Sequence, residues 1–183
     1  MCRHYQIESD EFTSLKSVSG YSDIILKQKD IKVLNKAPII MAIDRKPYLR
    51  EMGFGFTLYD KPVYNARIET VSERPLFADL FKKQRCLIPI TAFFEDDEYH
   101  VEHRFKAKEK LFYLLGLYSH NEFVILTKKP NEEVAYYHYR MPFAINQDEA
   151  SFYLDETKTL LDIGTLKSPD IKADDSSTQL SLF

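Results

Sequence analysis

Apolar positions along this chain fall into short runs that are separated by polar and turn-forming residues. Seven of these runs are rich in Ile, Leu, Phe, Tyr and Val, which is the composition of β-strands. The predicted strands cover residues 4–7, 38–43, 54–58, 86–90, 112–118, 123–127 and 141–145. The pattern therefore indicates a core built mainly from sheets.

Helical patterns are fewer than strand patterns. They cover residues 11–17, 76–83 and 148–154, with one further helical turn over 131–137. Strands and helices do not alternate regularly, which disfavours a doubly wound sheet. The sequence predicts an α+β fold, a β-rich single domain with a barrel-like or twisted antiparallel core and a few flanking helices.

The composition of the chain changes near Lys167. After this point Pro, Asp, Ser and Thr predominate, and such a segment buries too little apolar area to fold by itself. We therefore expect one domain over residues 1–166 and a flexible tail over residues 167–183.

Composition narrows the classes of protein further. The 183 residues are 44% hydrophobic and 29% charged, as in soluble globular proteins, and no apolar run reaches membrane-spanning length. Two cysteines and no export signal favour a reducing cytoplasm, and the pattern predicts neither a metal nor another cofactor. The formal net charge of −3 leaves nucleic-acid binding to a local basic patch.

Cys2 directly follows the first residue, Met1. Removal of Met1 would leave a thiol and a free α-amine two carbons apart. The amine can condense with an aldehyde to a Schiff base, and the thiol can then close a thiazolidine ring on the same carbon. An α-amine with a pKa of roughly 7.7–8.0 is partly neutral near pH 7. Position alone also fits a cysteine that stands there by chance.

Four segments carry candidate chemistry. They are MCRHY from Met1, YNARIET from Tyr64, RCLIP from Arg85 with AFFE from Ala92, and HYRMP from His138. In this order they resemble the SRAP ("SOS-response-associated peptidase") family of abasic-site crosslinking proteins, whose pattern is Met-Cys, N-A-R-x-E, R-C-[LIV]-[IV]-P with a G-F-[YF]-E turn, and H-x-R-M-P. The resemblance implies the SRAP fold and a protein that senses abasic sites in single-stranded DNA.

The resemblance also implies roles for individual residues. Cys2 would be the nucleophile once Met1 is gone, Asn65 would hold the Cys2 backbone or the sugar, and Glu95 and His138 would move protons. Arg67 and Arg140 would bind DNA phosphates.

Each residue taken alone has a simpler structural explanation. Asn65 fits a turn, Glu95 fits the acidic tip of a hairpin, and His138 fits an aromatic cluster. Arg67 and Arg140 fit surface ion pairs, and Cys86 fits a buried strand position. The four segments in family order outweigh these explanations.

The chain departs from the family pattern at several positions. The family start is commonly Met-Cys-Gly-Arg, so that either Arg3 supplies the missing cation or the loop differs from that of the family. The chain has no Trp. Phe54 stands in the segment where the family usually has one, and we expect it to offer a stacking face for a base. Asp96 follows Glu95 and should weaken DNA binding or raise the pKa of Glu95.

The last five residues resemble the pentapeptide with which bacterial proteins bind the replication sliding clamp. Leu182 and Phe183 would anchor in an apolar pocket, with Leu180 beside them and the Gln179 amide fixing the register. The alternative is a terminus that ends apolar by chance. Clamp binding would associate a bacterial cytoplasmic protein with replication at the nucleoid.

Two other functions remain compatible with the sequence. One is a thiol peptidase or autopeptidase with Cys2 as nucleophile and His138 as base. The other is a non-enzymatic adaptor that binds single-stranded DNA and uses its tail for recruitment.

Overall fold

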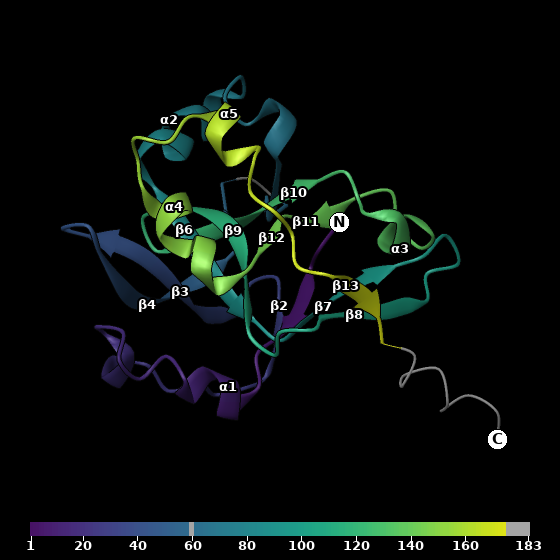
Figure 1. The fold of residues 1–183 in the computed structure, drawn as a ribbon, viewed down its shortest axis with the longest axis horizontal. Coiled ribbons are helices and arrows are strands. Elements are labelled where there is room, and N and C mark those ends of the chain that lie inside the picture. Colours follow the sequence, from purple (N-terminus) through teal and green to yellow (C-terminus); the bar gives the residue numbers. More distant parts are fainter. Residues whose placement is uncertain (59–60, 175–183) are drawn as a thin grey trace.

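The computed structural model describes residues 1–58 and 61–174. Two sheets form most of this part of the chain, and short helices flank them (Figure 1). The β-rich α+β fold predicted from the sequence is confirmed. No helix of the described residues is long and apolar enough to cross a membrane.

The larger sheet closes on itself as a barrel. Its strand order is β11-β10-β4-β3-β6-β9-β12, and β10 pairs with β9 as well as with β4, so that five strands form a ring. The strands are β3 (Lys36–Ile43), β4 (Lys46–Phe54), β6 (Arg85–Ile90), β9 (Phe112–Ser119), β10 (Glu122–Lys128), β11 (Met141–Pro142) and β12 (Ala144–Ile145). A short strand, β5 (Asn65–Arg67), pairs with β10 in parallel.

Gly116 allows the barrel to close tightly. A Cβ at this position would lie 2.8 Å from the Val124 carbonyl oxygen and 2.5 Å from Cδ1 of Ile88. No side chain fits at these distances, so glycine permits the close approach of β9 and β10.

The smaller sheet carries the amino terminus. Its order is β13-β8-β7-β1-β2, and every pairing is antiparallel. Its strands are β1 (His4–Gln6), β2 (Asp30–Lys32), β7 (Ala92–Asp96), β8 (Glu102–Ala107) and β13 (Ile171–Ala173). Only Thr91 separates β6 of the barrel from β7 of this sheet, and the Thr91 amide donates to the Gln6 carbonyl. This junction fixes the two sheets relative to each other.

The helices are short and cover the outside of the sheets. They are α1 (Ser9–Thr13), α2 (Pro75–Lys83), α3 (Glu132–Ala135), α4 (Ala150–Leu154) and α5 (Leu160–Ile163), with 3-10 turns η1 (Tyr21–Asp23), η2 (Ile68–Thr70) and η3 (Gln147–Glu149). The longest, α2, begins with Pro75 at its first turn and ends with two lysines, both favourable positions. It buries Phe77 and Phe81 and packs against β6 and β9.

The structure confirms most predicted elements and corrects some. The predicted strand over 54–58 is wrong, because β4 ends at Phe54 and Gly55 has a φ of 105°. The 141–145 run is two short strands. The predicted strands do not include β2, β5, β7, β8 and β13, and they include only the last residue of β4. Several of these strands carry charged residues on their exposed positions, so their apolar alternation is weak.

The packed body extends beyond the predicted boundary at residue 166. Ile171 is fully buried, and β13 pairs with β8. Asp174 forms ion pairs with Arg104 and Lys106 at 2.6 and 2.8 Å. The expectation of a tail that begins at residue 167 is therefore wrong, since β8 supplies the apolar and charged partners that the segment lacks by itself. Residues 175–183, with the predicted clamp motif, lie outside the described residues.

Candidate active site at the amino terminus

The pairing of β1 with β7 places the amino terminus over Glu95. His4 is opposite Phe94 in the register, so that Met1 and Cys2 extend past the end of β1 toward the Glu95 side chain. The α-amino group of Met1 lies 3.0 Å from Glu95 Oε2 and 3.2 Å from His138 Nε2. Figure 1 shows the amino terminus between the two sheets and close to α3.

Asn65 holds the backbone of Cys2. Its Nδ2 donates to the Cys2 carbonyl oxygen at 2.9 Å, from a position on β5 that the parallel pairing with β10 fixes. Asn65 Oδ1 is buried, and it has no hydrogen-bond partner among the described residues. The four residues predicted to form a site, Cys2, Asn65, Glu95 and His138, therefore lie together although they span most of the chain.

The carboxyl group of Glu95 is almost completely buried, at 2% exposure. Burial raises its pKa to about 7, because a buried charge lacks the solvation of water. The nearby Met1 ammonium lowers the pKa and Asp96 raises it, but both effects are smaller. Glu95 is thus poised to take up or release a proton near neutral pH.

The loop that carries His138 is held by an ion pair between the buried Arg140 and the more exposed Glu69, whose side chain is 38% exposed. Both terminal nitrogens of Arg140 contact the Glu69 carboxylate at 2.8 Å, and one also donates to the Thr127 carbonyl. His138 Nδ1 lies 2.8 Å from the Arg140 carbonyl oxygen and 3.2 Å from the Arg140 amide nitrogen, and the shorter contact favours the tautomer with the ring proton on Nδ1. Nε2 is then free to accept from the Met1 ammonium.

The His138 ring is neutral near pH 7. Burial lowers its pKa most strongly; the hydrogen bond to the Arg140 carbonyl raises the pKa by less, and the Met1 ammonium lowers it by less again. The Nδ1 atom lies 3.8 Å from Glu95 Oε2. A neutral imidazole and a carboxyl of nearly neutral pKa therefore flank one α-amine.

The Cys2 thiol is fully buried and donates to the His4 carbonyl oxygen at 3.7 Å. Burial raises its pKa well above that of an ordinary thiol, and the negative charge of Glu95 adds to this effect. Cys2 is therefore a protonated thiol in this structure rather than a thiolate.

A cavity of about 420 Å³ opens beside this group. Glu95, His138, Tyr64 and Phe94 are among its lining residues. A second cavity of about 340 Å³ shares Arg3, Tyr64 and Glu102 with the first and also reaches Lys32. The aromatic lining was not predicted from the sequence, because no spacing along the chain relates Tyr64 to Phe94.

Two predicted DNA contacts do not face solvent. Phe54 is fully buried and stacks on Phe123 with ring centroids 5.2 Å apart, so the expectation that it stacks on a base is wrong. Arg140 is 6% exposed and uses its guanidinium within the protein, which contradicts a role in phosphate binding. Its partner Glu69 was not predicted, although it stands in the quoted N-A-R-x-E segment, which is the signal that could have found it.

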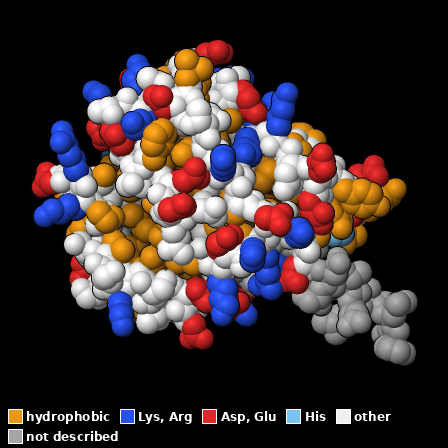
Figure 2. All heavy atoms as spheres, in the orientation of Figure 1, with side chains coloured by type: hydrophobic (Ala, Val, Ile, Leu, Met, Phe, Trp, Pro, Cys, Tyr) orange, Lys and Arg blue, Asp and Glu red, His pale blue; other side chains and the backbone are white. Residues whose placement is uncertain are grey.

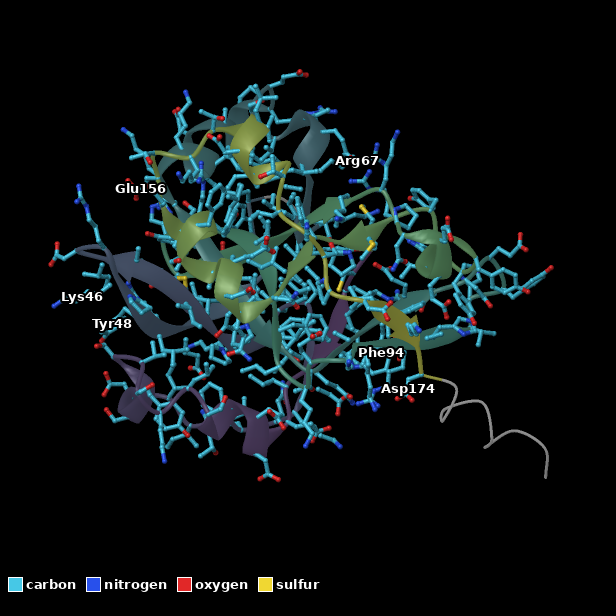
Figure 3. The ribbon with its side chains drawn as sticks, in the orientation of Figure 1. Lys46, Tyr48, Arg67, Phe94, Glu156 and Asp174 are labelled. Carbon is cyan, nitrogen blue, oxygen red and sulfur yellow. The ribbon has the colours of Figure 1, made fainter. Side chains whose placement is uncertain are left out.

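Arg67 and Arg3 remain accessible. Arg67 is exposed on β5, two residues from Asn65, and Figure 3 labels it beside the barrel. The Arg3 side chain is 60% exposed and pairs with Asp96 at 2.5 Å. Arg3 thereby neutralises the extra carboxylate that follows Glu95.

Within the described part of the chain, no three His, Cys, Asp or Glu side chains cluster in a way that suits a metal ion.

Known proteins resemble this chain in sequence and in fold. "Abasic site processing protein YoaM" of Bacillus subtilis is 30% identical over 127 residues, which are 62% of this chain and 54% of that protein. "Abasic site processing protein YobE" of the same organism is 31% identical over 109 residues, 52% of this chain and 50% of that protein. The chain thus spans about half the length of the curated relatives it matches.

Solved structures match over most of the chain. A protein from Bacteroides thetaiotaomicron has a TM-score of 0.77 at 21% identity and covers 94% of this chain and 90% of its own. A protein from Bordetella bronchiseptica has a TM-score of 0.74 at 18% identity, over 94% and 99%. The model of the family described as "SOS response associated peptidase (SRAP)" matches residues 1–176, and the chain therefore belongs to the SRAP family.

Proposed function

We propose that this protein processes abasic sites in single-stranded DNA and binds them covalently through Cys2 after removal of Met1. The names of the curated relatives support abasic-site processing. The observation that carries the covalent step is the geometry at the amino terminus. Glu95 and His138 both lie within hydrogen-bond reach of the Met1 α-amine, one residue before the Cys2 nitrogen that becomes the α-amine when Met1 is removed.

The proposed reaction begins with the amine. The opened abasic sugar presents an aldehyde at C1′, and the neutral amine of Cys2 adds to this carbon. Loss of one water gives an imine. The Cys2 sulfur then adds to the same carbon, and its proton passes to the nitrogen, which closes a five-membered thiazolidine ring. The net change is the loss of one water, and no oxidant or reductant is needed.

The raised pKa of the Cys2 thiol supports this order of steps. A protonated thiol is a weak nucleophile, whereas an α-amine is partly neutral near pH 7. Ionised Glu95 can accept the proton of the ammonium and later return it as the carbinolamine loses water. Glu95 can also protonate the ring oxygen when the sugar opens.

The thiol peptidase is the less supported alternative. It needs a thiolate activated by His138. In the described residues His138 contacts the Met1 amine and the Arg140 backbone, while the Cys2 thiol contacts the His4 carbonyl.

Incubation with abasic single-stranded DNA, followed by a denaturing gel, tests the proposal of a covalent link through Cys2. A shifted band that survives heating supports it, and non-covalent binding alone would instead favour the adaptor.

Arg67 should contribute a phosphate contact. Replacing it with Ala should weaken binding to single-stranded DNA and reduce the slope of log K against log salt by about 0.7, because one fewer counterion is released. Titrations at several salt concentrations measure this slope. Lys46→Ala is the matched control, since Lys46 lies at the far end of the molecule from Arg67 (Figure 3). An unchanged slope in Arg67→Ala would contradict the prediction.

The clamp motif over residues 179–183 stays a prediction. Its two terminal anchors, Leu182 and Phe183, would bind the sliding clamp with micromolar affinity, about −7 to −8 kcal/mol. Deleting residues 179–183 should abolish co-elution with the clamp and leave crosslinking to naked abasic DNA intact, since the chemistry resides in the described body. Clamp binding that survives the deletion would contradict the motif. Such binding would connect the protein with replication in a bacterial cytoplasm.

A further inference from the structure

Exposed aromatic side chains gather at the end of the molecule that holds α3 and the β7–β8 hairpin. Tyr99, Tyr136 and Tyr139 are 78%, 86% and 67% exposed, which is unusual for side chains of this size. Figure 2 shows hydrophobic side chains together at this end. The proposed chemistry uses none of these three tyrosines.

Tyr139 is the one of the three that lines the 420 Å³ cavity. Its ring lies 4.6 Å from the His138 ring, centroid to centroid, at an angle of 33°. A flat and largely exposed ring therefore borders the pocket that holds Glu95 and the α-amine. Tyr136, three residues earlier, is not among the lining residues and packs edge-on against Tyr137.

The charged side chains around the cavity determine whether a phosphate group or a base is favoured beside Tyr139. Asp96, Asp97 and Glu98 line the same cavity and disfavour phosphate groups there. Lys32 lines only the second cavity, so its ammonium favours phosphate groups there, whereas Arg3 borders both cavities and is paired with Asp96. A single strand that threads the site would keep its backbone toward Lys32 and turn its bases toward the acidic edge.

We propose that Tyr139 is the stacking face for an unpaired nucleobase next to the abasic nucleotide. The inference rests on the proposed function, because it takes single-stranded DNA as the ligand. Aromatic stacking tolerates any base, since every base has a π-face, and it suits a protein that must bind a lesion in any sequence. Duplex DNA keeps its bases stacked on one another and cannot use this face.

The test uses an oligonucleotide that cannot react. A single strand with a tetrahydrofuran abasic analogue, which lacks the aldehyde, carries the fluorescent base 2-aminopurine on one side or the other of the analogue. Wild-type protein should quench 2-aminopurine on one side. Tyr139→Ala should remove the quenching and raise Kd about tenfold. Tyr139→Phe keeps the aromatic ring, so it should show the quenching and the Kd of the wild type. Tyr136→Ala is the matched control and should bind as the wild type does.

Measurements at two salt concentrations distinguish a stacking contribution of Tyr139 from an electrostatic one. The ratio of Kd between Tyr139→Ala and wild type should be the same at low and at high salt, because stacking releases no counterions. The proposal is wrong if Tyr139→Ala binds the oligonucleotide and quenches 2-aminopurine as strongly as the wild type. It is also wrong if Tyr139→Phe loses as much affinity and quenching as Tyr139→Ala. If instead the wild type forms no crosslink with true abasic DNA, the proposed function fails while this binding test still decides the role of Tyr139.

Discussion

Replacing Cys2 with Ser should abolish the heat-stable crosslink to abasic single-stranded DNA. The α-amine is retained, so an imine can still form, but the hydroxyl gives an oxazolidine that opens far more readily than a thiazolidine. The measurement is the fraction of DNA retained in the shifted band after heating. Folding should be unaffected, because the change replaces one small buried side chain with another.

Cys86→Ala is the control for this experiment. Cys86 is the other cysteine of the chain, is fully buried on β6 and takes no part in the proposed site. It should crosslink as the wild type does. If Cys2→Ser also gives a durable crosslink, the proposed chemistry is wrong, and another nucleophile must be sought.

Replacing Glu95 with Gln should slow crosslinking about 100-fold or more, the contribution expected of a positioned acid or base. Gln keeps the shape of the side chain but cannot exchange a proton with the α-amine. The measurement is the rate of crosslink formation at saturating DNA. Glu109→Gln is the control, because Glu109 is an exposed carboxylate that lines neither cavity of the site.

The pH dependence of this rate follows from the raised pKa of Glu95. The ionised carboxylate accepts the proton of the ammonium, so the rate should rise as pH increases through about 7 and then level off. In Glu95→Gln this inflection should disappear, leaving the rise that follows deprotonation of the amine itself at roughly pH 8. A rate profile that is the same in both proteins would contradict the role of Glu95.

Part of this protein could be predicted from the sequence because the signals are local. The strands over Arg85–Ile90 and Glu122–Lys128 each contain an unbroken apolar run, and α2 has Pro at its start and lysines at its end. The motif order identified Cys2 and Glu95 as candidates, since residue types and spacing are visible in the chain itself.

Elements whose structure depends on partners far away in the chain could not be predicted from the sequence. β8 reads as a polar segment, and only Phe105 on it is buried, so its place in the sheet depends on pairing with β7 and β13. β13 likewise reads as part of a polar tail, yet its pairing with β8 buries Ile171 completely.

The sequence by itself determined which side chains could take part in chemistry, while the tertiary structure decided which of them meet and in what state. Arg140 and Arg67 look alike as residues of family motifs. Arg140 is buried and, through its ion pair with Glu69, supports the loop that carries His138. Arg67 is exposed. Burial also raises the pKa of Glu95 to about 7. Both outcomes depend on desolvation by distant segments, which no local pattern records.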